Sequence, residues 1–283
     1  MSDRSLVLGL VGSGIGRSLT PAMQEAEGLA HGLALGYRLI DAGRLGLDSA
    51  DLPELLRWAR RLGFDGLNIT HPFKQAVVPL LDELSDAAHD LGAVNTVVLR
   101  DGRAVGHNTD WSGYGRAFRA VLPDAVRDRA VLVGAGGAGM AVGYALLDQG
   151  AAHLAVHDTD PERAEAAVVR LTKRFDAHRV SVVEDLADAL ADADGLVNAT
   201  PIGMHGHEGL PVEARLVRPH HWVSDVVYFP LETELVALAR SRGCRVVPGG
   251  GMAVGQAVDA FELFTGRSAD VDRMSRHFAE LTR

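Results

Sequence analysis

The stretch Val131-Leu-Val-Gly-Ala-Gly-Gly-Ala-Gly-Met-Ala141 decides the fold, because it spaces three glycines in the register G-x-G-x-x-G. An apolar run typical of a buried strand precedes the glycines, and a helical pattern follows them. In this context Gly134 allows a tight turn, Gly136 lets a pyrophosphate approach the backbone, and Gly139 lets helix and strand pack closely. The stretch predicts a dinucleotide-binding βαβ unit; the alternative is a glycine-rich turn that binds no ligand.

An acidic residue, Asp158, stands about 20 residues beyond the last glycine, at the end of the next predicted strand. Its carboxylate can accept hydrogen bonds from ribose hydroxyls and would repel a 2′-phosphate, which favours NAD over NADP. The alternative is that Asp158 or Asp160 only caps the helix that begins at Pro161, and we assign the cap to Asp160. Arg163 is the residue that could favour NADP. The expected cofactor contacts in this part of the chain are Gly134, Ala135, Gly136, Gly137, Ala138, Gly139, Asp158 and Arg163.

Apolar runs alternate with helical patterns from end to end of the 283 residues, which predicts an α/β fold with largely parallel sheets. Strands are expected at 6–11, 36–41, 65–69, 94–99, 103–107, 130–133, 153–157, 180–182, 194–198, 222–226 and 245–247. Helices are expected from 21 onward, over 51–62, 73–80 and 111–122, between the later strands, and from 254 to the end. No flexible linker divides the chain, so two domains would have to be joined by helices.

Composition excludes several classes of function. The net charge of −9, without a basic stripe, argues against nucleic acid as a partner. The single cysteine, Cys244, cannot form an internal disulfide and is expected to be a buried thiol. The apolar run 6–11 is too short for a membrane span or a secretion signal, so we expect a cytoplasmic protein. The twelve histidines have no metal-ligand spacing, and a phosphate-binding loop of ATPases is absent from the sequence, so no metal is expected.

Small polar residues gather at the ends of the predicted strands in the N-terminal half. They occur at 18–20, 68–74, 95–96 and 106–110. Ligands of open α/β sheets bind outside the carboxyl ends of the strands. These segments supply hydroxyls, amides, an ammonium and a carboxylate, which suit a small polyhydroxylated acid.

Six spaced strings resemble the signature of the shikimate dehydrogenase family, in order along the whole chain. They are Ser18-Leu-Thr20-Pro21, Asn68-Ile-Thr70-x-Pro72-x-Lys74, Gly92-Ala-Val-Asn95-Thr96, Gly106-x-Asn108-Thr109-Asp110, Asn198-Ala-Thr200-Pro201-x-Gly203-Met204 and Gly251-Met252-x-x-x-Gln256. The resemblance implies a substrate domain over 1–109, completed by C-terminal helices over 254–283. It also implies a Rossmann-like NAD-binding domain over 110–253, with the active site in the cleft.

The resemblance also implies roles for individual residues. Lys74 and Asp110 would form the catalytic pair, and Ser18 and Thr20 would hold the substrate carboxylate. The ring hydroxyls would be bound by Thr70, Asn95, Asp110 and Gln256. Further cofactor contacts would come from Thr200, Pro201, Met204, Val227, Tyr228, Gly251 and Met252.

The chemistry of Lys74 can be argued without the family. Oxidation of a secondary alcohol needs a group that takes the hydroxyl proton while hydride leaves the carbon, and a lysine with a lowered pKa qualifies. A neighbouring carboxylate such as Asp110 favours the charged ammonium, so the alternative is that the pair orients the hydroxyl and relays its proton to water. Outside this signature, Lys74 would be interpreted as a solvated residue and Asp110 as a helix cap.

Two departures from the commonest family pattern favour one branch. The basic stretch that receives the 2′-phosphate in NADP-using members is replaced by His157-Asp158-Thr159-Asp160. Thr20 stands where many members carry serine, and His71 lies inside the Asn-Ile-Thr-x-Pro string. Both features resemble the NAD-dependent quinate/shikimate dehydrogenases.

We therefore expect an NAD-dependent enzyme that oxidises a ring hydroxyl of shikimate or quinate, working as a monomer or homodimer on a small-molecule substrate. Within the family, the alternatives are an NADP-dependent biosynthetic shikimate dehydrogenase and an aminoshikimate or aminoquinate dehydrogenase. From another class, the chain could be a non-catalytic, redox-sensing NAD-binding protein. The presence of both Lys74 and Asp110 speaks against the sensor.

Overall fold

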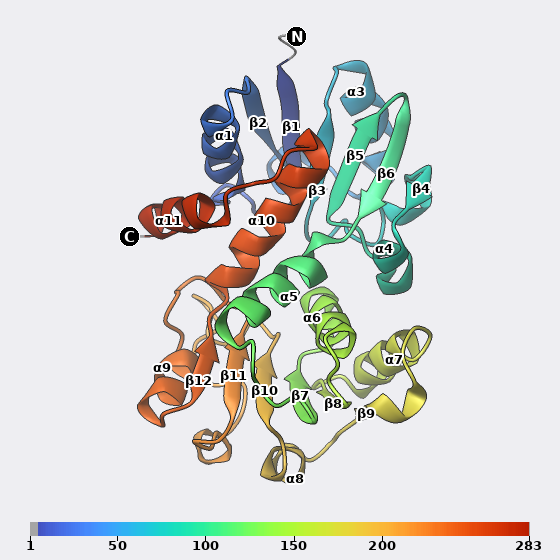
Figure 1. The fold of residues 1–283 in the computed structure, drawn as a ribbon. Coiled ribbons are helices and arrows are strands. Elements are labelled where there is room, and N and C mark those ends of the chain that lie inside the picture. The colour runs from blue at the N-terminus through green and yellow to red at the C-terminus, as the bar shows by residue number, and fades with distance from the viewer. Residues whose placement is uncertain (1–4, 283) are drawn as a thin grey trace. The chain divides into compact units, whose positions relative to one another are not determined.

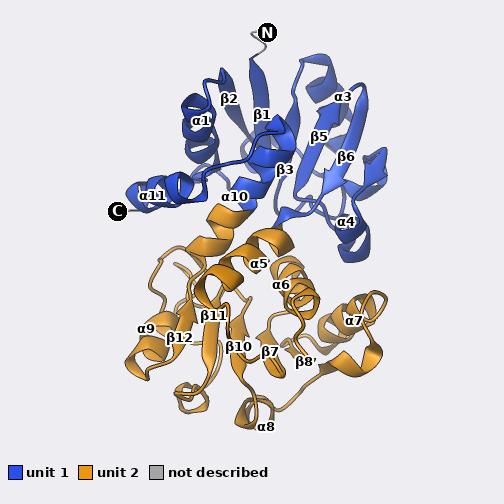
Figure 2. Ribbon diagram, viewed as in Figure 1, with its two compact units in different colours: residues 1–109, 256–283 blue, residues 110–255 orange. Residues whose placement is uncertain are grey.

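The computed structural model describes residues 5–282 and divides the chain into two units (Figure 2). Unit 1 contains the described residues up to 109 and those from 256 onward, and unit 2 contains residues 110–255. The chain passes between the units twice, once within α5 (Thr109–Val121) and once within α10 (Gly250–Thr265). Both crossings are therefore helical.

The sheet of unit 1 has six strands in the order β2-β1-β3-β5-β6-β4 (Figure 1). Their bounds are β1 Leu6–Gly12, β2 Leu35–Asp41, β3 Gly66–Ile69, β4 Glu83–Leu84, β5 Thr96–Arg100 and β6 Arg103–His107. Strands β1, β2 and β3 are parallel, whereas β5 runs antiparallel to both β3 and β6. This reversal places the first residue of β5 at the same edge as the last residues of β1, β3 and β6. The polar segments at these strand ends therefore share one edge.

Helices cover this sheet with apolar side chains. They are α1 Thr20–Ala30, α2 Ala42–Leu45, α3 Leu52–Arg61, α4 Asp86–Leu91 and α11 Val271–Leu281, with short 3-10 helices η1 Ser49–Asp51 and η2 Val78–Leu80, and the second part of α10. Leu56 of α3 belongs to one buried cluster, and Phe264 of α10 belongs to another together with Leu8. A Cβ on Gly66 would lie 2.2 Å from the Phe264 ring, so this helix approaches β3 as closely as a glycine allows.

The helix predicted over 73–80 is wrong. This segment consists of turns followed by η2 (Val78–Leu80). Pro79 has no N–H for the helical hydrogen bond, and its ring would clash with the carbonyl four residues earlier. Lys74 consequently lies in a turn, and its carbonyl accepts the N–H of Val94 at 2.8 Å. That bond ties the turn to the segment that leads into β5.

Unit 2 has the strand order β12-β11-β10-β7-β8-β9, with every pairing parallel. The strands are β7 Arg129–Val133, β8 His153–His157, β9 Val180–Val182, β10 Gly195–Asn198, β11 Trp222–Asp225 and β12 Arg245–Val247. The helices are α6 Gly137–Asp148, α7 Pro161–Leu171, α8 Leu186–Ala191 and α9 Glu234–Ser241, with 3-10 helices η3 Ala177–Arg179 and η4 Ala214–Leu216. In chain order within this unit the sheet runs 3-2-1-4-5-6, which is the doubly wound Rossmann order. The order reverses between β7 and β10, where such sheets bind dinucleotides.

Within unit 2, α5 and the first turns of α10 approach each other through small residues. A Cβ on Gly255 would lie 2.4 Å from the carbonyl oxygen of Gly113, and one on Gly251 would lie 2.9 Å from Cβ of Ala117. Residues four apart share one helix face, so each helix presents two small residues to the other. The two helices in which the chain crosses between the units are thus packed almost backbone to backbone.

A buried carboxylate holds α11 against α1. Glu27 is 1% exposed and accepts hydrogen bonds from Nε and Nη2 of Arg273 at 2.7 and 2.6 Å. The N–H of Asp270 donates to the same carboxylate at 2.8 Å, and Nε2 of His31 lies 3.0 Å from it. Burial by itself would raise the pKa of Glu27, but these hydrogen bonds and the arginine charge outweigh burial and lower the pKa.

Replacing Arg273 by alanine should reduce the free energy of unfolding at pH 7, because a buried carboxylate loses its charged partner. The loss should shrink as the pH falls below about 4, since the stabilisation is fully present above the ordinary pKa, near 4.3, and is lost as the pH falls through the lowered pKa of the folded state. Denaturant unfolding at several pH values measures both effects. Arg276→Ala, at an exposed position of the same helix, is the matched control. Equal, small losses in the two variants would mean that the pair does not stabilise the fold.

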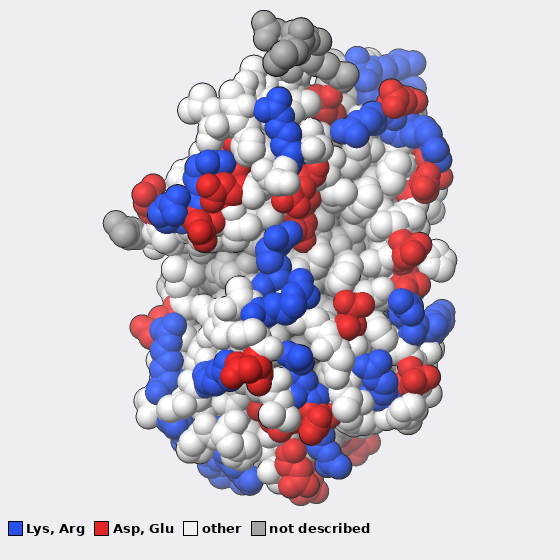
Figure 3. All heavy atoms as spheres, viewed as in Figure 1, with Lys and Arg blue, Asp and Glu red and all other residues white. Residues whose placement is uncertain are grey.

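No helix within residues 5–282 is long and apolar enough to cross a membrane. Within the same residues, no group of three or more His, Cys, Asp or Glu side chains could hold a metal ion. On the face drawn in Figure 3, acidic and basic side chains are interspersed. Cys244 is buried, as predicted, and its Sγ lies 3.2 Å from the carbonyl of Arg218.

Candidate functional site

Asn95 is the centre of a buried hydrogen-bond network at the polar edge of unit 1. It is 2% exposed, and its Oδ1 accepts the N–H of Thr109 at 2.7 Å and the hydroxyl of Thr96 at 3.1 Å. Its Nδ2 donates to the hydroxyl of Thr109 at 3.0 Å and to Oε1 of Gln256 at 3.4 Å. The network fixes Thr109, the residue directly before Asp110, and brings Asn95 and Gln256 together.

Asn68 extends this network from the neighbouring strand β3. Its Nδ2 donates to the carbonyl of Asn95 at 3.2 Å and to the hydroxyl of Thr96 at 3.0 Å. Its Oδ1 accepts the hydroxyl of Tyr37 at 2.7 Å, and burial raises the pKa of Tyr37, which keeps that hydroxyl a neutral donor. Asn68 and Thr96 belong to the family strings, but sequence reasoning gave them no role. They hold Asn95 in place.

The other residues predicted for unit 1 lie along the same edge. The hydroxyl of Ser18 accepts the N–H of Thr20 at 3.3 Å where α1 begins. Thr70 follows β3 and donates its N–H to the carbonyl of Val11 at 2.9 Å, and Lys74 lies in the turn beyond. In unit 2, Asp110 is 6% exposed and lies in the first turn of α5. The positive end of the helix dipole favours a carboxylate there.

The glycine turn of unit 2 contains glycines that packing requires and glycines that border open space. Gly134 has φ +99°, which favours glycine, and a Cβ on Gly139 would lie 1.9 Å from the carbonyl oxygen of Gly134. A Cβ on Gly136 or Gly137 would instead meet nothing within 4 Å. Packing therefore requires the first pair, whereas the second pair leaves open space at the start of α6. The first N–H groups of a helix have no intrahelical partner, so this space suits a pyrophosphate.

Asp158 lies at the end of β8 and is coupled to the glycine turn. Its Oδ2 accepts the N–H of Ala135 at 2.8 Å, and its Oδ1 accepts the N–H of Asp160 at 3.0 Å. Burial by itself would raise the pKa of Asp158, but the two backbone hydrogen bonds and the charge of Arg163 lower it. The group is therefore an anion with lone pairs left for further donors.

Two residues after Asp158, Asp160 and Arg163, have different roles in the structure. Asp160 caps α7, as predicted, by accepting the N–H of Arg163 at 3.4 Å. The guanidinium of Arg163 lies 3.9 Å from Asp158 and 3.6 Å from Asp160, and its side chain is 57% exposed. Two carboxylates thus offset the charge that would attract a 2′-phosphate.

On the other side of the glycine turn lie the segments that follow β10 and β11. A Cβ on Gly134 would be 2.9 Å from Cγ2 of Thr200, so the turn and Thr200 are in contact. The N–H of Val227 donates to Oδ1 of Asp225 at 3.0 Å. The remaining predicted residues are the exposed Pro201, Met204 and Tyr228, and the half-buried Gly251 and Met252 at the start of α10.

Sequence reasoning missed three buried polar residues beside these segments. Asn198, Asp225 and Thr233 are 0%, 1% and 1% exposed, and Asp225 accepts hydrogen bonds from the other two. An aspartate at the end of an apolar run, as Asp225 is, was the one signal in the sequence, but it does not identify a partner.

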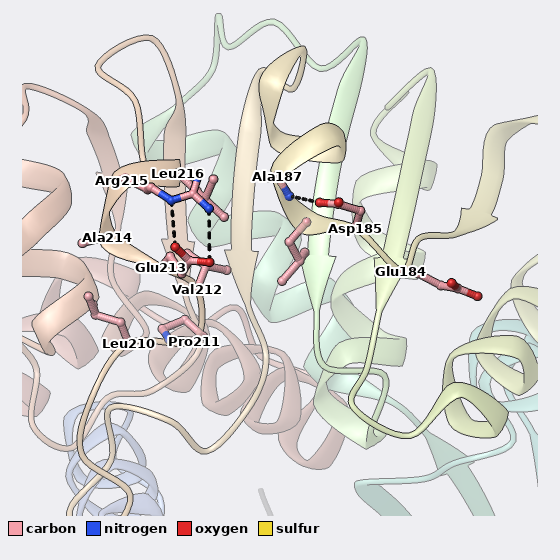
Figure 4. A pocket seen from close by; sticks show the side chains of 11 residues that line it. Glu184, Asp185, Ala187, Leu210, Pro211, Val212, Glu213, Ala214, Arg215 and Leu216 are labelled. Atoms are coloured by element: carbon pink, nitrogen blue, oxygen red, sulfur yellow. Dashed lines mark hydrogen bonds and ion pairs between the residues drawn. The ribbon is translucent and has the colours of Figure 1, made fainter.

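A cavity of about 860 Å³ in unit 2 lies apart from the predicted site residues (Figure 4). It is lined by Glu184, Asp185, Leu186, Ala187 and the segment 210–216. Asp185 caps α8 by accepting the N–H of Ala187 at 2.7 Å, and Glu213 pairs with Arg215 at 2.8 Å. The charged side chains of Asp185, Glu213 and Arg215 thus have hydrogen-bond partners within the protein, and we assign no ligand to the cavity.

The strand order, the glycine turn and the carboxylate at the end of β8 define a Rossmann-type dinucleotide-binding protein that carries a second α/β unit. Residues 10–97 match the family model described as "Shikimate dehydrogenase substrate binding domain", and residues 249–276 match that described as "Shikimate 5'-dehydrogenase C-terminal domain". The chain belongs to the shikimate dehydrogenase family.

Three relatives illustrate the similarity. A shikimate dehydrogenase (NADP(+)) of Streptomyces avermitilis is 54% identical, with 99% of this chain and 97% of the relative covered. A quinate/shikimate dehydrogenase (NAD(+)) of Corynebacterium efficiens is 51% identical, with 99% and 100% covered. The solved structure of quinate dehydrogenase from Corynebacterium glutamicum in complex with NAD has a TM-score of 0.93 at 50% identity, with 98% of this chain and 99% of that chain covered.

Proposed function

We propose that this protein is an NAD-dependent dehydrogenase that oxidises a ring hydroxyl of quinate or shikimate to the 3-dehydro acid. The observation that carries the proposal is the anionic Asp158, held beside the glycine turn in a member of the shikimate dehydrogenase family. Relatives that are more than 50% identical to this chain include one named for NADP(+) and one named for NAD(+). The cofactor is therefore argued from the residues of this chain.

The residues around the turn fit a dinucleotide. The open space at Gly136 and Gly137 would receive the pyrophosphate on the N–H groups at the start of α6. Asp158 would accept the adenosine ribose hydroxyls, and Thr200 and Val227 would lie on the nicotinamide side. Nicotinamide, when bound, supplies the acceptor for hydride. A 2′-phosphate would face the carboxylate of Asp158, which disfavours NADP.

The residues of unit 1 suit a polyhydroxylated carboxylic acid. We propose that Ser18 and Thr20 hold the carboxylate and that Thr70, Asn95 and Gln256 bind ring hydroxyls. Asn95 is hydrogen-bonded to Thr109 through both its Oδ1 and its Nδ2, so its orientation is fixed before a substrate arrives. Lys74 and Asp110 are the proposed catalytic residues, and Lys74 handles the proton of the reacting hydroxyl.

The cofactor preference is the first consequence to test. We expect kcat/KM to be at least about tenfold higher with NAD than with NADP, which corresponds to about 1.4 kcal/mol. Asp158→Ser should narrow this gap, mainly by weakening NAD. Asp160→Ser is the matched control, because serine can still cap α7 while one nearby carboxylate is lost. Initial rates with both cofactors decide the matter, and equal rates for the wild type would refute the preference.

A buried free thiol without a disulfide partner is typical of a reducing compartment, so we propose a cytoplasmic enzyme. We propose a monomer or a homodimer. An NADP-dependent biosynthetic enzyme is the second candidate, favoured by the name of the Streptomyces relative.

A further inference from the structure

We propose that Asp225 is a positioning residue for the nicotinamide side of the cofactor site, acting through the side-chain amide of Asn198 on Thr200. The inference rests on the proposed function, and it adds residues to which neither the family strings nor the site prediction gave a role. Asp225 ends β11 and Asn198 ends β10, and the two strands are paired in register at these residues. Asn198 is 0% exposed and Asp225 is 1% exposed.

Asp225 acts only as an acceptor. Its Oδ1 accepts Nδ2–H of Asn198 at 2.9 Å and the N–H of Val227 at 3.0 Å, and its Oδ2 accepts the hydroxyl of Thr233 at 2.6 Å. Three donors thus converge on one carboxylate. Burial raises the pKa of Asp225, and the hydrogen bonds from Thr233, Val227 and Asn198 oppose that rise. Removing the carboxylate would leave the Nδ2–H of Asn198 and the N–H of Val227 without this acceptor.

The carboxylate anchors the amide of Asn198. Its Nδ2 donates to Asp225 and to the carbonyl of Ile202 at 3.0 Å. Its Oδ1 accepts the N–H of Thr200 at 3.0 Å and the hydroxyl of Thr200 at 2.7 Å. A backbone N–H can only donate and a carbonyl can only accept, so Thr200, Ile202 and Asp225 all favour the same orientation of this amide. Asp225 therefore holds the Nδ2 end of an amide whose Oδ1 end holds Thr200.

Thr200 is the point at which this network meets the glycine turn. The turn follows β7, which pairs with β10, and a Cβ on Gly134 would lie 2.8 Å from the carbonyl of Ala199. The Thr200 hydroxyl also accepts the N–H of Ile202 at 3.1 Å, which closes the loop after β10. Asp225 therefore holds two backbone segments next to the strand-order reversal, one at Thr200 and one at Val227.

The test is Asp225→Ala, read by NADH affinity and by melting temperature without cofactor. We expect the Kd for NADH and the KM for NAD to rise about tenfold or more, because the Asn198 amide and the N–H of Val227 both lose the acceptor that holds them. Thr233→Val is the matched control. It removes another buried partner of Asp225 and the cap of α9, so it should lower the melting temperature but change the NADH Kd by less than about threefold.

Asn198→Ala tests the same path from its other end, because it removes the amide and leaves Asp225 in place. It should also raise the NADH Kd about tenfold or more, and the double variant Asp225→Ala with Asn198→Ala should bind NADH within about threefold of the weaker single variant, since two residues of one network are not additive. If Asp225→Ala does not fold, the NADH Kd of Asn198→Ala is the readout. Unchanged NADH binding in Asn198→Ala or in a folded Asp225→Ala, equal weakening in Thr233→Val, or losses that multiply in the double variant would each overturn the proposal. A wild type that does not bind NADH would instead refute the proposed function.

Discussion

Replacing Lys74 by alanine is expected to lower kcat by about 10² to 10⁴, while KM for the acid changes much less. The reason is that the hydroxyl proton must leave while hydride leaves the carbon, and a group that handles this proton acts mainly in the transition state. The backbone of Lys74 is held by its bond to Val94, which does not involve the side chain. This bond remains possible in the variant, and its melting curve reports any loss that comes from the side chain.

Gln75→Ala is the matched control for this loss, because Gln75 is the exposed next residue of the same turn. Steady-state rates and melting curves of the two variants separate chemistry from folding. A Lys74→Ala enzyme with near-native kcat would show that another group handles the proton. A large loss in Gln75→Ala would show that the turn, and not the ammonium, is needed.

Gly139→Ala should reduce kcat/KM for the cofactor by more than about 10² and lower the free energy of unfolding by about 2 kcal/mol or more. Its Cβ would lie 1.9 Å from a backbone oxygen, that of Gly134, which no side-chain rotation can relieve. Either α6 moves away from β7 or the turn opens, and both changes displace the N–H groups at the start of α6. Denaturant unfolding and NADH titration measure the two effects.

Gly136→Ala gives the informative contrast. Its Cβ would meet no protein atom within 4 Å, and its φ of −72° suits any residue, so stability should change by less than about 1 kcal/mol. The methyl group would nevertheless occupy the space proposed for the pyrophosphate, so NADH affinity should fall at least about tenfold. Unchanged NADH affinity in Gly136→Ala would place the cofactor elsewhere.

The predicted strands correspond to strands in the structure because each was an apolar run between turn residues. The runs at 130–133 and 153–157, for example, correspond to β7 and β8. The helix expected over 73–80 is absent because Pro79 interrupts helical hydrogen bonding, a local effect that can be recognised in the sequence. The short α4 and β4 were not predicted. A six-residue helix and a two-residue strand carry too few side chains for a periodic signal.

The site was predicted where a residue type has a direct chemical use. The glycine spacing and the acid at 158 could be found because each has a known physical role in binding a dinucleotide. The residues that position others could not be found in this way. Asn198 and Asp225 are 27 residues apart, and their contact depends on the pairing of β10 with β11, which no local pattern contains.

NAD-dependent oxidation of both acids is tested by a matrix of initial rates with quinate and shikimate, each measured with NAD and with NADP. We expect turnover of both acids with NAD, with kcat/KM values within about a hundredfold of each other, or about 2.7 kcal/mol. We also expect NADP rates at least about tenfold lower for each acid. Rates with NADP that equal or exceed those with NAD, or no turnover of either acid, would contradict the proposed function.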